Sequence, residues 1–231
     1  MSQISTHFTR SSFDAALPEG TIVNELNFDS LVAGSTVSNG ETIQDIQFSF
    51  DFGDVLLSVV DSGTTTSSPN FLGTNDLDLL QDGDNIDFIF PDAIAVGLNI
   101  ISADELLDDD LTLTFLDVPV SLVGLDVEQT LSDGSTVHFL GITSTDESAI
   151  TASLATIGGG FFLYNIDNIV VVSMAPIILG DINQDGLVNL LDVEPFIGVI
   201  NSGTFQSEAD CNEDGVVNLL DVEPFIALLS G

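Results

Sequence analysis

DINQDGLVNLLDVEPFIGVI at residues 181–200 is repeated as DCNEDGVVNLLDVEPFIALL at residues 210–229, and 14 of the 20 aligned positions are identical. Each copy has Asp or Asn at its first, third and fifth positions and Gly at its sixth. EF-hand loops place oxygen ligands at positions 1, 3, 5, 7, 9 and 12, and they need Gly at position 6 because the backbone there turns too sharply for a Cβ atom. The duplicated stretch therefore predicts two calcium-binding loops, each followed by a helix.

Both copies supply an oxygen donor at every position that an EF-hand loop requires. Asn189 and Asn218 also stand where helix N-caps are expected, with Asp three residues later, so ion binding and helix initiation should be coupled. Calcium is the expected cofactor, with two ions in this region. The predicted ligands of the first ion are Asp181, Asn183, Asp185, the Leu187 carbonyl, Asn189 and Asp192, and those of the second are Asp210, Asn212, Asp214, the Val216 carbonyl, Asn218 and Asp221.

The helix that follows each loop carries a proline and a row of apolar residues. Pro195 and Pro224 lie about six residues after the expected caps, so we expect them to kink each helix or to restart it. The apolar residues recur at mostly helical spacing, and most of them are expected to form a core shared by the two repeats, with the remainder buried against the β domain or another molecule. They are Val193, Phe196, Ile197, Val199 and Ile200 in the first repeat and Val222, Phe225, Ile226, Leu228 and Leu229 in the second.

The text D-x-N-x-D-G-x-V-N-x-x-D, with Asp at position 12 and one helix after each loop, resembles a type I dockerin module over residues 180–231. The resemblance implies docking onto a cohesin domain through helix faces next to the loops. This sequence differs at loop positions 10 and 11, where small hydroxyl residues are common in cellulosomal dockerins. The residues there are candidates for contact with a partner: Leu190, Leu191, Leu219 and Leu220.

Residues 13–174 follow another pattern, in which short Phe-rich or β-branched runs alternate with Gly, Asn, Asp and Ser. Roughly nine to eleven strands without a long helix predict a mainly β sandwich. The Asp133-Gly134 pair predicts a two-residue turn, with positive φ at both positions, between antiparallel segments 125–131 and 136–142. Residues 103–107 could form a short helix. The expected strands are 43–50, 55–60, 86–90, 95–101, 111–115, 118–125, 136–142, 160–166 and 168–172.

The stretch 173–180, which contains Pro176, separates these patterns and predicts a β domain at residues 1–175 and a calcium-binding module at residues 176–231. Within the β domain, FDAALPEGTIVNEL, LSDGSTVHFLGITSTDESAI and FFLYNIDNIVV resemble the jelly-roll domain of secreted bacterial proteins with a PEP-type sorting tail. That resemblance implies a jelly-roll β-sandwich, carbohydrate-binding-like, with a structural calcium ion between its first and last strands. Asp14 and Asp167 are the candidate ligands, and the alternative is that both face solvent at strand ends.

The chain carries 37 Asp and Glu residues against a single basic residue, Arg10, which gives a formal net charge of −36. Nucleic acid and anionic membranes are excluded as partners, because both need a Lys/Arg footprint. Such an excess repels itself on folding, so the folded state needs bound divalent cations or high ionic strength, unless the acidity is itself an adaptation to salt. The acidic clusters at residues 76–87 and 104–110 match no closed ligand spacing and are expected to be solvated loops or loose calcium sites.

The sequence also bears on where the protein works. Cys211 is the only cysteine and lies in the second loop, where a packing role is expected. No apolar run reaches the roughly 18 residues of a membrane span, and the N-terminal residues lack the apolar core of a signal peptide. The calcium loops nevertheless favour an extracellular or cell-surface location, because millimolar calcium there fills weak sites.

No catalytic motif accompanies the carboxylates. His7 and His138 stand apart from any nucleophile, zinc or phosphate motif, so a non-enzymatic protein is expected. We expect a calcium-binding surface or adhesion protein whose C-terminal module docks onto a cohesin-like protein and whose sandwich binds a glycan or matrix component. A sugar platform is limited by the absence of Trp and the presence of one Tyr, Tyr164. The alternative is a subunit that assembles with copies of itself into a calcium-stabilised extracellular filament or layer.

Overall fold

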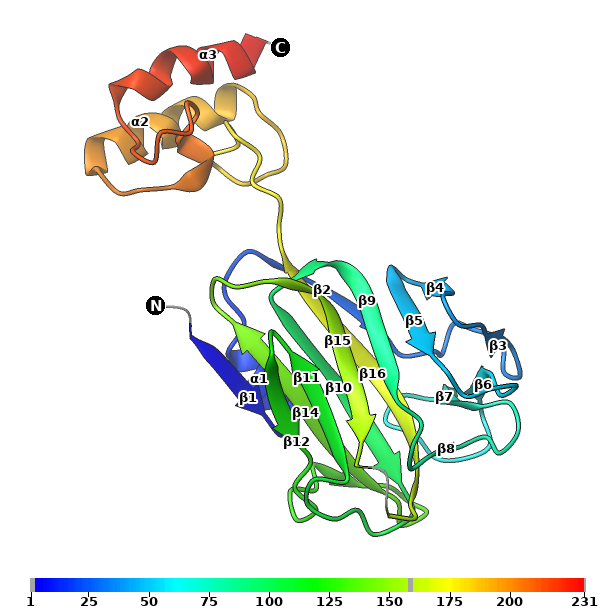
Figure 1. Ribbon diagram of the computed structural model, residues 1–231. Coiled ribbons are helices and arrows are strands. Elements are labelled where there is room, and N and C mark those ends of the chain that lie inside the picture. Colours follow the sequence, from blue (N-terminus) through cyan, green and yellow to red (C-terminus); the bar gives the residue numbers. More distant parts are fainter. Residues whose placement is uncertain (1–2, 158–159, 231) are drawn as a thin grey trace. The chain divides into compact units, whose positions relative to one another are not determined.

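The computed structural model describes residues 3–157 and 160–230, and its contacts divide the chain into compact units at residues 1–174 and 175–231 (Figure 1). In the described residues, the first unit is a two-sheet β-sandwich with one short helix, and the second contains two α-helices and three 3-10 turns. The predicted mainly β fold with a small helical module after it is confirmed.

The larger sheet has ten strands in the described part of the chain. Its order is β1-β14-β10-β16-β7-β6-β3, with β13 beside β14 and with β2 and β8 beside β16. The strands are β1 (Ile4–His7), β2 (Thr21–Leu26), β3 (Thr36–Val37), β6 (Leu57–Val60), β7 (Phe71–Thr74), β8 (Leu80–Gln81), β10 (Ala95–Ser102), β13 (Gln129–Thr130), β14 (Thr136–Ser144) and β16 (Leu163–Met174).

The smaller sheet follows the order β12-β11-β15-β9-β5-β4. Its strands pair antiparallel, as those of the larger sheet do. They are β4 (Thr42–Ile43), β5 (Ile46–Phe50), β9 (Ile86–Ala93), β11 (Leu111–Phe115), β12 (Val118–Ser121) and β15 (Ala149–Thr156).

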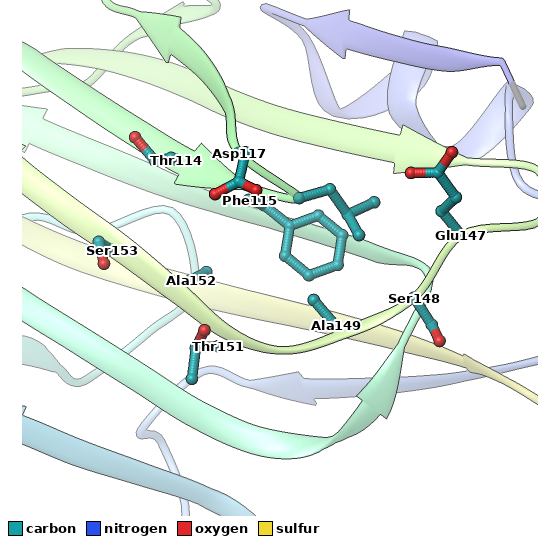
Figure 2. Close-up of a pocket in the computed structure, with 10 residues that line it drawn as sticks. Thr114, Phe115, Asp117, Glu147, Ser148, Ala149, Thr151, Ala152 and Ser153 are labelled. Atoms are coloured by element: carbon teal, nitrogen blue, oxygen red, sulfur yellow. The ribbon is translucent and has the colours of Figure 1, made fainter.

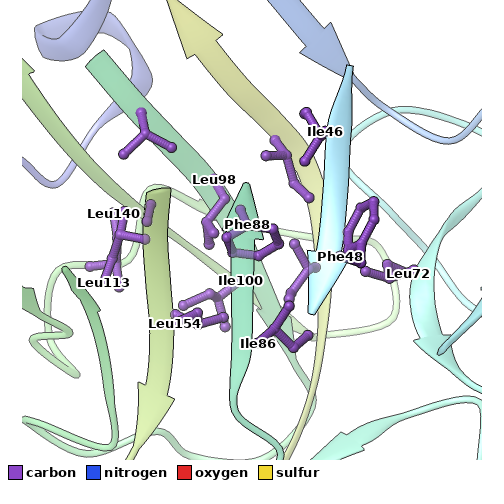
Figure 3. Packing of buried hydrophobic residues seen from close by; sticks show 14 of the residues in the cluster. Ile46, Phe48, Leu72, Ile86, Phe88, Leu98, Ile100, Leu113, Leu140 and Leu154 are labelled. Carbon is purple, nitrogen blue, oxygen red and sulfur yellow. The ribbon is translucent and has the colours of Figure 1, made fainter. Parts of the chain in front are cut away.

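Strand β5 shows how the sequence buries one face of a sheet. Ile46, Phe48 and Phe50 are buried, and the polar residues between them point the other way, because successive strand side chains face opposite sides. Phe48 meets Phe88 of β9 edge to face, with 5.8 Å between ring centroids. Figure 3 shows these side chains beside residues of the larger sheet such as Leu98, in one apolar core between the sheets.

The outer face of the larger sheet is covered at one end by the short helix α1 (Arg10–Ala15). Thr9 caps this helix, since its side chain accepts a hydrogen bond from the Ser12 N–H. Phe13 is fully buried against Phe139 of β14, with 5.5 Å between ring centroids. The helix therefore adds a second, smaller apolar cluster outside the main core.

Several predicted strand boundaries were wrong because single residues adopt left-handed backbone conformations. The predicted strand 43–50 is two paired strands, β4 and β5, since Gln44 and Asp45 turn the chain with φ of 47° and 64°. Conversely, predicted strands 160–166 and 168–172 are one strand, β16, which continues through Asn168 at φ 49°. Residues 103–107 are not helical, and α1, β1, β2, β7 and β15 were not predicted.

The predicted hairpin before β14 exists but is smaller than expected. Strands β13 and β14 pair antiparallel over two residues, as the register of Gln129 with Val137 shows. Only Gly134 of the Asp133-Gly134 pair has positive φ, at 93°. Leu131 donates its N–H to the Ser135 carbonyl at 2.8 Å, so the loop between them has three residues instead of two.

In the second unit, each α-helix follows a 3-10 turn: Leu190–Asp192 precedes α2 (Val193–Ser202), and Leu219–Asp221 precedes α3 (Val222–Ser230). A third such turn spans Ser207–Ala209. The change of helix type places Pro195 in the first turn of α2, where a missing N–H costs no hydrogen bond. The two predicted outcomes were a kinked helix and a helix that restarts near the proline. The structure shows the second, because the 3-10 turn ends and the α-helix begins just before Pro195.

Most of the apolar residues predicted for the core of this unit lie in it. Phe196 and Phe225 stack with 4.2 Å between ring centroids, and Ile182 and Ala209 are buried with them. Cys211 packs against this cluster, as expected. Three residues predicted for the core lie on the outer side of the helices: Ile197, Ile226 and Leu228 are 53%, 55% and 40% exposed. No helix in residues 3–157 and 160–230 is long and apolar enough to cross a membrane.

Candidate metal centres

The first predicted calcium loop is closed by hydrogen bonds from its own backbone to its acidic side chains. Asp181 accepts the N–H of Asp185 at 3.1 Å on Oδ1 and that of Gly186 at 2.9 Å on Oδ2. Asp185 in turn accepts the Leu187 N–H at 3.0 Å. Gly186 has φ of 86°, the left-handed conformation for which Gly was expected. Side chains from the first and fifth loop positions are thereby held within one tight turn.

Asp192, at the twelfth position, joins the end of the loop to its beginning. Its Oδ1 accepts the Asn183 N–H at 3.0 Å and its Oδ2 accepts the Asn189 N–H at 2.9 Å. Asn189 caps the following turn by accepting the Leu191 N–H at 2.8 Å, and the reciprocal capping box is complete. The predicted cap is confirmed, and one carboxylate belongs to both the cap and the loop, while its coupling to ion binding stays a prediction.

The second loop reproduces the first. Asp210 accepts the N–H groups of Asp214 and Gly215 at 3.1 and 2.9 Å. Asp221 accepts the Asn212 and Asn218 N–H groups at 3.1 and 2.8 Å, and its capping box is also complete. Two separate segments therefore adopt the same geometry from the same residue pattern.

The electrostatics of the loops fit a bound cation. Asp181 and Asp210 are only 4% and 7% exposed, and Asp192 and Asp221 are fully buried. The sole Lys or Arg of the chain, Arg10, belongs to the other unit. Buried carboxylates without a positive partner are costly, so a hard divalent cation would stabilise both loops.

Arg10 is fully engaged in the β-sandwich. It bonds Asp14 at 2.7 Å and makes a bidentate contact with Glu25 at 3.0 Å. Although partial burial opposes its charge, these hydrogen bonds raise the pKa of the guanidinium. Charge neutralisation in the second unit therefore has to come from outside the chain.

Coordination by the twelve predicted ligands stays a prediction. Across residues 3–157 and 160–230, no group of three or more His, Cys, Asp or Glu side chains is gathered in a way that could hold a metal. Each loop has three carboxylates, and its other three predicted donors are two Asn side chains and one backbone carbonyl. The donor set is all oxygen, as calcium prefers, and half of it is of types other than carboxylate.

The structure does not support a shared calcium site at Asp14 and Asp167. Asp14 is on the surface and pairs with Arg10. Asp167 is fully buried and accepts hydrogen bonds from the hydroxyls of Thr65 and Thr66, the latter at 2.6 Å, and from the Ser67 N–H at 3.0 Å. Burial raises the pKa of Asp167, and these hydrogen bonds oppose that rise. Each carboxylate has its own protein partners, and calcium binding by this pair stays a prediction.

The carboxylates of the acidic clusters accept hydrogen bonds from backbone N–H groups of their own loops and of neighbouring loops. Asp110 is buried and accepts the Leu107 N–H at 2.6 Å, while Asp84 accepts the Gln81 N–H at 2.9 Å. Asp108 and Asp104 bind the N–H groups of Gly124 and Leu163 across neighbouring loops, both near 2.9 Å. These contacts link loops to one another.

The histidines are packing residues. His7 lies edge-on to Phe13, with 5.9 Å between ring centroids, and its Nε2 contacts the Thr143 hydroxyl at 2.9 Å. His138 is 3% exposed on β14. Burial lowers the pKa of both side chains. The Nε2 of His138 contacts the Thr136 hydroxyl at 3.3 Å, so each ring is hydrogen-bonded to a threonine of β14.

Next to the buried carboxylates, the second unit exposes a repeated apolar surface. Leu190 and Leu191 are 81% and 67% exposed, and Leu219 and Leu220 are 76% and 67% exposed. These leucines do not belong to the core. Phe196 and Phe225, which occupy equivalent positions in the repeats, stack on each other, so the repeats contact each other through equivalent residues.

The loop geometry, the capping boxes and the paired helices together agree with one known module. Residues 179–230 match the dockerin type I domain. The second unit therefore contains a dockerin-like module, a non-catalytic kind of domain associated with calcium-dependent protein docking. No curated protein matches the chain. Among solved structures, the K2 cleaved adhesin domain of Lys-gingipain (Kgp) is similar at 12% identity and a TM-score of 0.31, over 64% of this chain and 97% of that chain.

Proposed function

We propose that the dockerin-like module binds two calcium ions and attaches the β-sandwich to a cohesin-like protein outside the cell. One observation carries this proposal. In each repeat two exposed leucines lie directly between predicted ligands, as Leu190 and Leu191 do between Asn189 and Asp192. An ion held by the loop would therefore fix the backbone that presents the leucines.

The exposed surface has the chemistry of a docking site. Leu190 and Leu191 are accompanied on α2 by exposed Glu194 and Ile197. The second repeat presents the same side chains in the same order, namely Leu219, Leu220, Glu223 and Ile226. Burying these apolar groups would drive association, and the surrounding acidic charge favours a partner with an apolar patch and a basic rim.

Because the two repeats present the same exposed side chains, the module has two equivalent docking surfaces. A partner that recognises one surface would find the same groups on the other after rotation of the module. Substitutions in one repeat should then be tolerated, and loss of binding should require changes in both.

We propose that the β-sandwich, which the module attaches to the partner, binds a glycan or matrix component. Tyr164 is fully buried with its hydroxyl donating to the Asp84 carbonyl at 2.8 Å, so it offers no aromatic platform. Recognition of a sugar would therefore rest mainly on hydrogen bonds. This role is non-enzymatic and suits an extracellular or cell-surface setting, where calcium is abundant.

A second candidate function is self-assembly into a calcium-stabilised filament or layer. The observation that favours it is the presence of two equivalent apolar surfaces on one module, since one copy could contact two neighbours through them. Sedimentation with and without calcium separates the candidates. Large, calcium-reversible assemblies of the pure protein support self-assembly, whereas a calcium-loaded monomer supports docking to another protein.

Calorimetric titration of the full chain with a purified type I cohesin domain tests the docking proposal. Binding should require calcium and disappear in EDTA. Leu190→Asp with Leu191→Asp should weaken binding only a few-fold, while all four leucines replaced by Asp should abolish it. Leu125→Asp is the matched control, because Leu125 is 94% exposed but lies in the sandwich. Unchanged binding by the fourfold variant, or binding unaffected by EDTA, would refute the proposal.

A further inference from the structure

A cavity of about 250 Å³ lies on the outer face of the larger sheet, at the end away from α1. Its floor contains Phe71 and Ile101, which are 3% and 4% exposed. Ile101 pairs with Asn165, whereas the adjacent Ile100 and Ile166 point into the main core. Because neighbouring strand residues face opposite ways, this floor is on the outside of the sandwich.

The wall on one side is a segment that we call the strap, residues 62–67. Its Ser62 and Thr64 line the cavity. Asp167 holds the strap from below by accepting hydrogen bonds from the hydroxyls of Thr65 and Thr66 and from the Ser67 N–H. A fully buried carboxylate therefore fixes the position of a Ser/Thr-rich wall that would otherwise be a free loop.

Two carboxylates line the cavity from other segments. Asp133 lies in the β13–β14 hairpin, and Asp78 lies in the β7–β8 connection at φ 60°. Asn165 fixes the latter by donating to the Asp78 carbonyl at 2.8 Å. A Cβ atom on Gly73 would lie 2.2 Å from that carbonyl, so only Gly lets the connection approach so closely. The site is thus formed in advance by buried groups.

The lining combines acceptors, a hydroxyl and one exposed apolar side chain. Its carboxylates are acceptors, and the Ser62 hydroxyl can donate or accept hydrogen bonds. Leu77 is 52% exposed, whereas Phe71 and Ile101 below it are almost fully buried. No lining residue is basic, so phosphates, uronic acids and other anions would be repelled. A ligand with several hydroxyls and one C–H face satisfies both parts of this lining, and the modest volume suits a single ring.

We infer that this cavity binds one neutral sugar unit of a glycan, with Asp78 and Asp133 accepting its hydroxyls and its C–H face lying against Leu77. The inference rests on the proposed glycan-binding role of the sandwich and gives that role a place and a ligand class. It is independent of what the dockerin-like module docks to.

Another cavity provides an internal control. About 360 Å³ in volume, it lies on the smaller sheet beside Asp117 and Glu147 (Figure 2). Asp117 has φ of 58°, close to that of Asp78. Asn tolerates this backbone conformation, so Asp78→Asn and Asp117→Asn are matched changes of charge in two cavities.

The test uses the full calcium-loaded chain and a panel of methyl glycosides of common hexoses, pentoses and N-acetylhexosamines, with binding followed by saturation-transfer NMR. At least one glycoside should bind with millimolar affinity. Asp78→Asn should weaken that binding at least tenfold, and Asp117→Asn should change it less than twofold. Asp133→Asn, on an accessible hairpin, should also weaken binding and serves if Asp78→Asn fails to fold.

The possible results distinguish the proposed cavity from the proposed glycan-binding role of the sandwich. Absence of binding by every glycoside would overturn both the inference and the glycan role, while leaving the docking proposal standing. Binding that persists in Asp78→Asn and Asp133→Asn but falls in Asp117→Asn would overturn the site alone. Binding of spermidine or glucosamine without any neutral glycoside would show that the cavity takes cations, and would overturn the ligand class.

Discussion

Asp192 and Asp221 are predicted calcium ligands, and the same side chains belong to the capping boxes that start the helices. Asp192 accepts N–H groups from Asn183 and Asn189, which are themselves predicted ligands, and it occupies the N3 position of the capping box. Its charge strengthens both hydrogen bonds. A change at this residue should therefore affect the loop, the cap and the exposed leucines between them.

Asp192→Asn keeps the size of the side chain and removes its charge. We expect calcium binding at the first loop to weaken more than about tenfold, and the second unit to lose about 2 kcal/mol of stability, as expected for hydrogen bonds to a charged group. Isothermal titration should then detect one strong site instead of two. Glu194→Gln, an exposed neighbour, should leave both sites intact. Two unaltered sites in Asp192→Asn would exclude Asp192 as a ligand.

His138 should make the sandwich sensitive to mild acid. Burial lowers its pKa below the ordinary value of 6.5, so the unfolded chain binds a proton more readily than the folded one. Stability should therefore fall as pH decreases from 6.5 to the folded-state pKa. In urea titrations at several pH values, the stability of His138→Gln relative to the wild type should rise as the pH decreases through this window. A difference that stays constant with pH would contradict the prediction.

At the scale of elements, local patterns were predictable and distant partners were not. The calcium loops close within twelve residues, so spacing alone predicted the positions that the structure brings together. Strand β5 lies within the predicted strand 43–50, and its alternating apolar and polar residues account for its buried face. Strand β15 was missed because AITASLAT contains mostly small or polar residues.

The strap could not be predicted, since Thr66 and its anchor Asp167 are 101 residues apart. The contact of Asp14 with Arg10 was also not predicted, although the two residues are only four positions apart. It depended on where α1 began, which the sequence did not reveal. The unpredicted contacts at the candidate sites thus include a local pair as well as contacts formed by tertiary packing.

The restart of each helix makes a specific prediction about its proline. Pro195→Ala should change the stability of the second unit by less than about 1 kcal/mol, because its missing N–H lies in the first turn of α2. Phe196→Ala removes a 3% exposed ring stacked on Phe225 and should cost about 3 kcal/mol or more. Thermal unfolding of both variants with calcium present measures the contrast. A gain of about 3 kcal/mol in Pro195→Ala would instead place the proline in the interior of a continuous helix.

For the whole molecule, the net charge of −36 is opposed in different ways in the two units. The sandwich has a large apolar core and uses Arg10 to bind Asp14 and Glu25. The second unit has only four fully packed apolar side chains and no basic residue. Its stability should depend on bound cations far more than that of the sandwich does.

Removal of calcium should therefore unfold one unit and spare the other. In EDTA the full chain should lose much of its helical far-ultraviolet signal, and amide NMR resonances of residues 175–231 should collapse to the narrow range of an unfolded segment, since metal binding there is coupled to folding. Resonances of the sandwich should keep their positions. Excess calcium should restore the spectrum, whereas sodium at the same ionic strength should not, because screening alone does not replace ligands. Retention of the helical signal in EDTA would mean that backbone hydrogen bonds suffice to hold the loops.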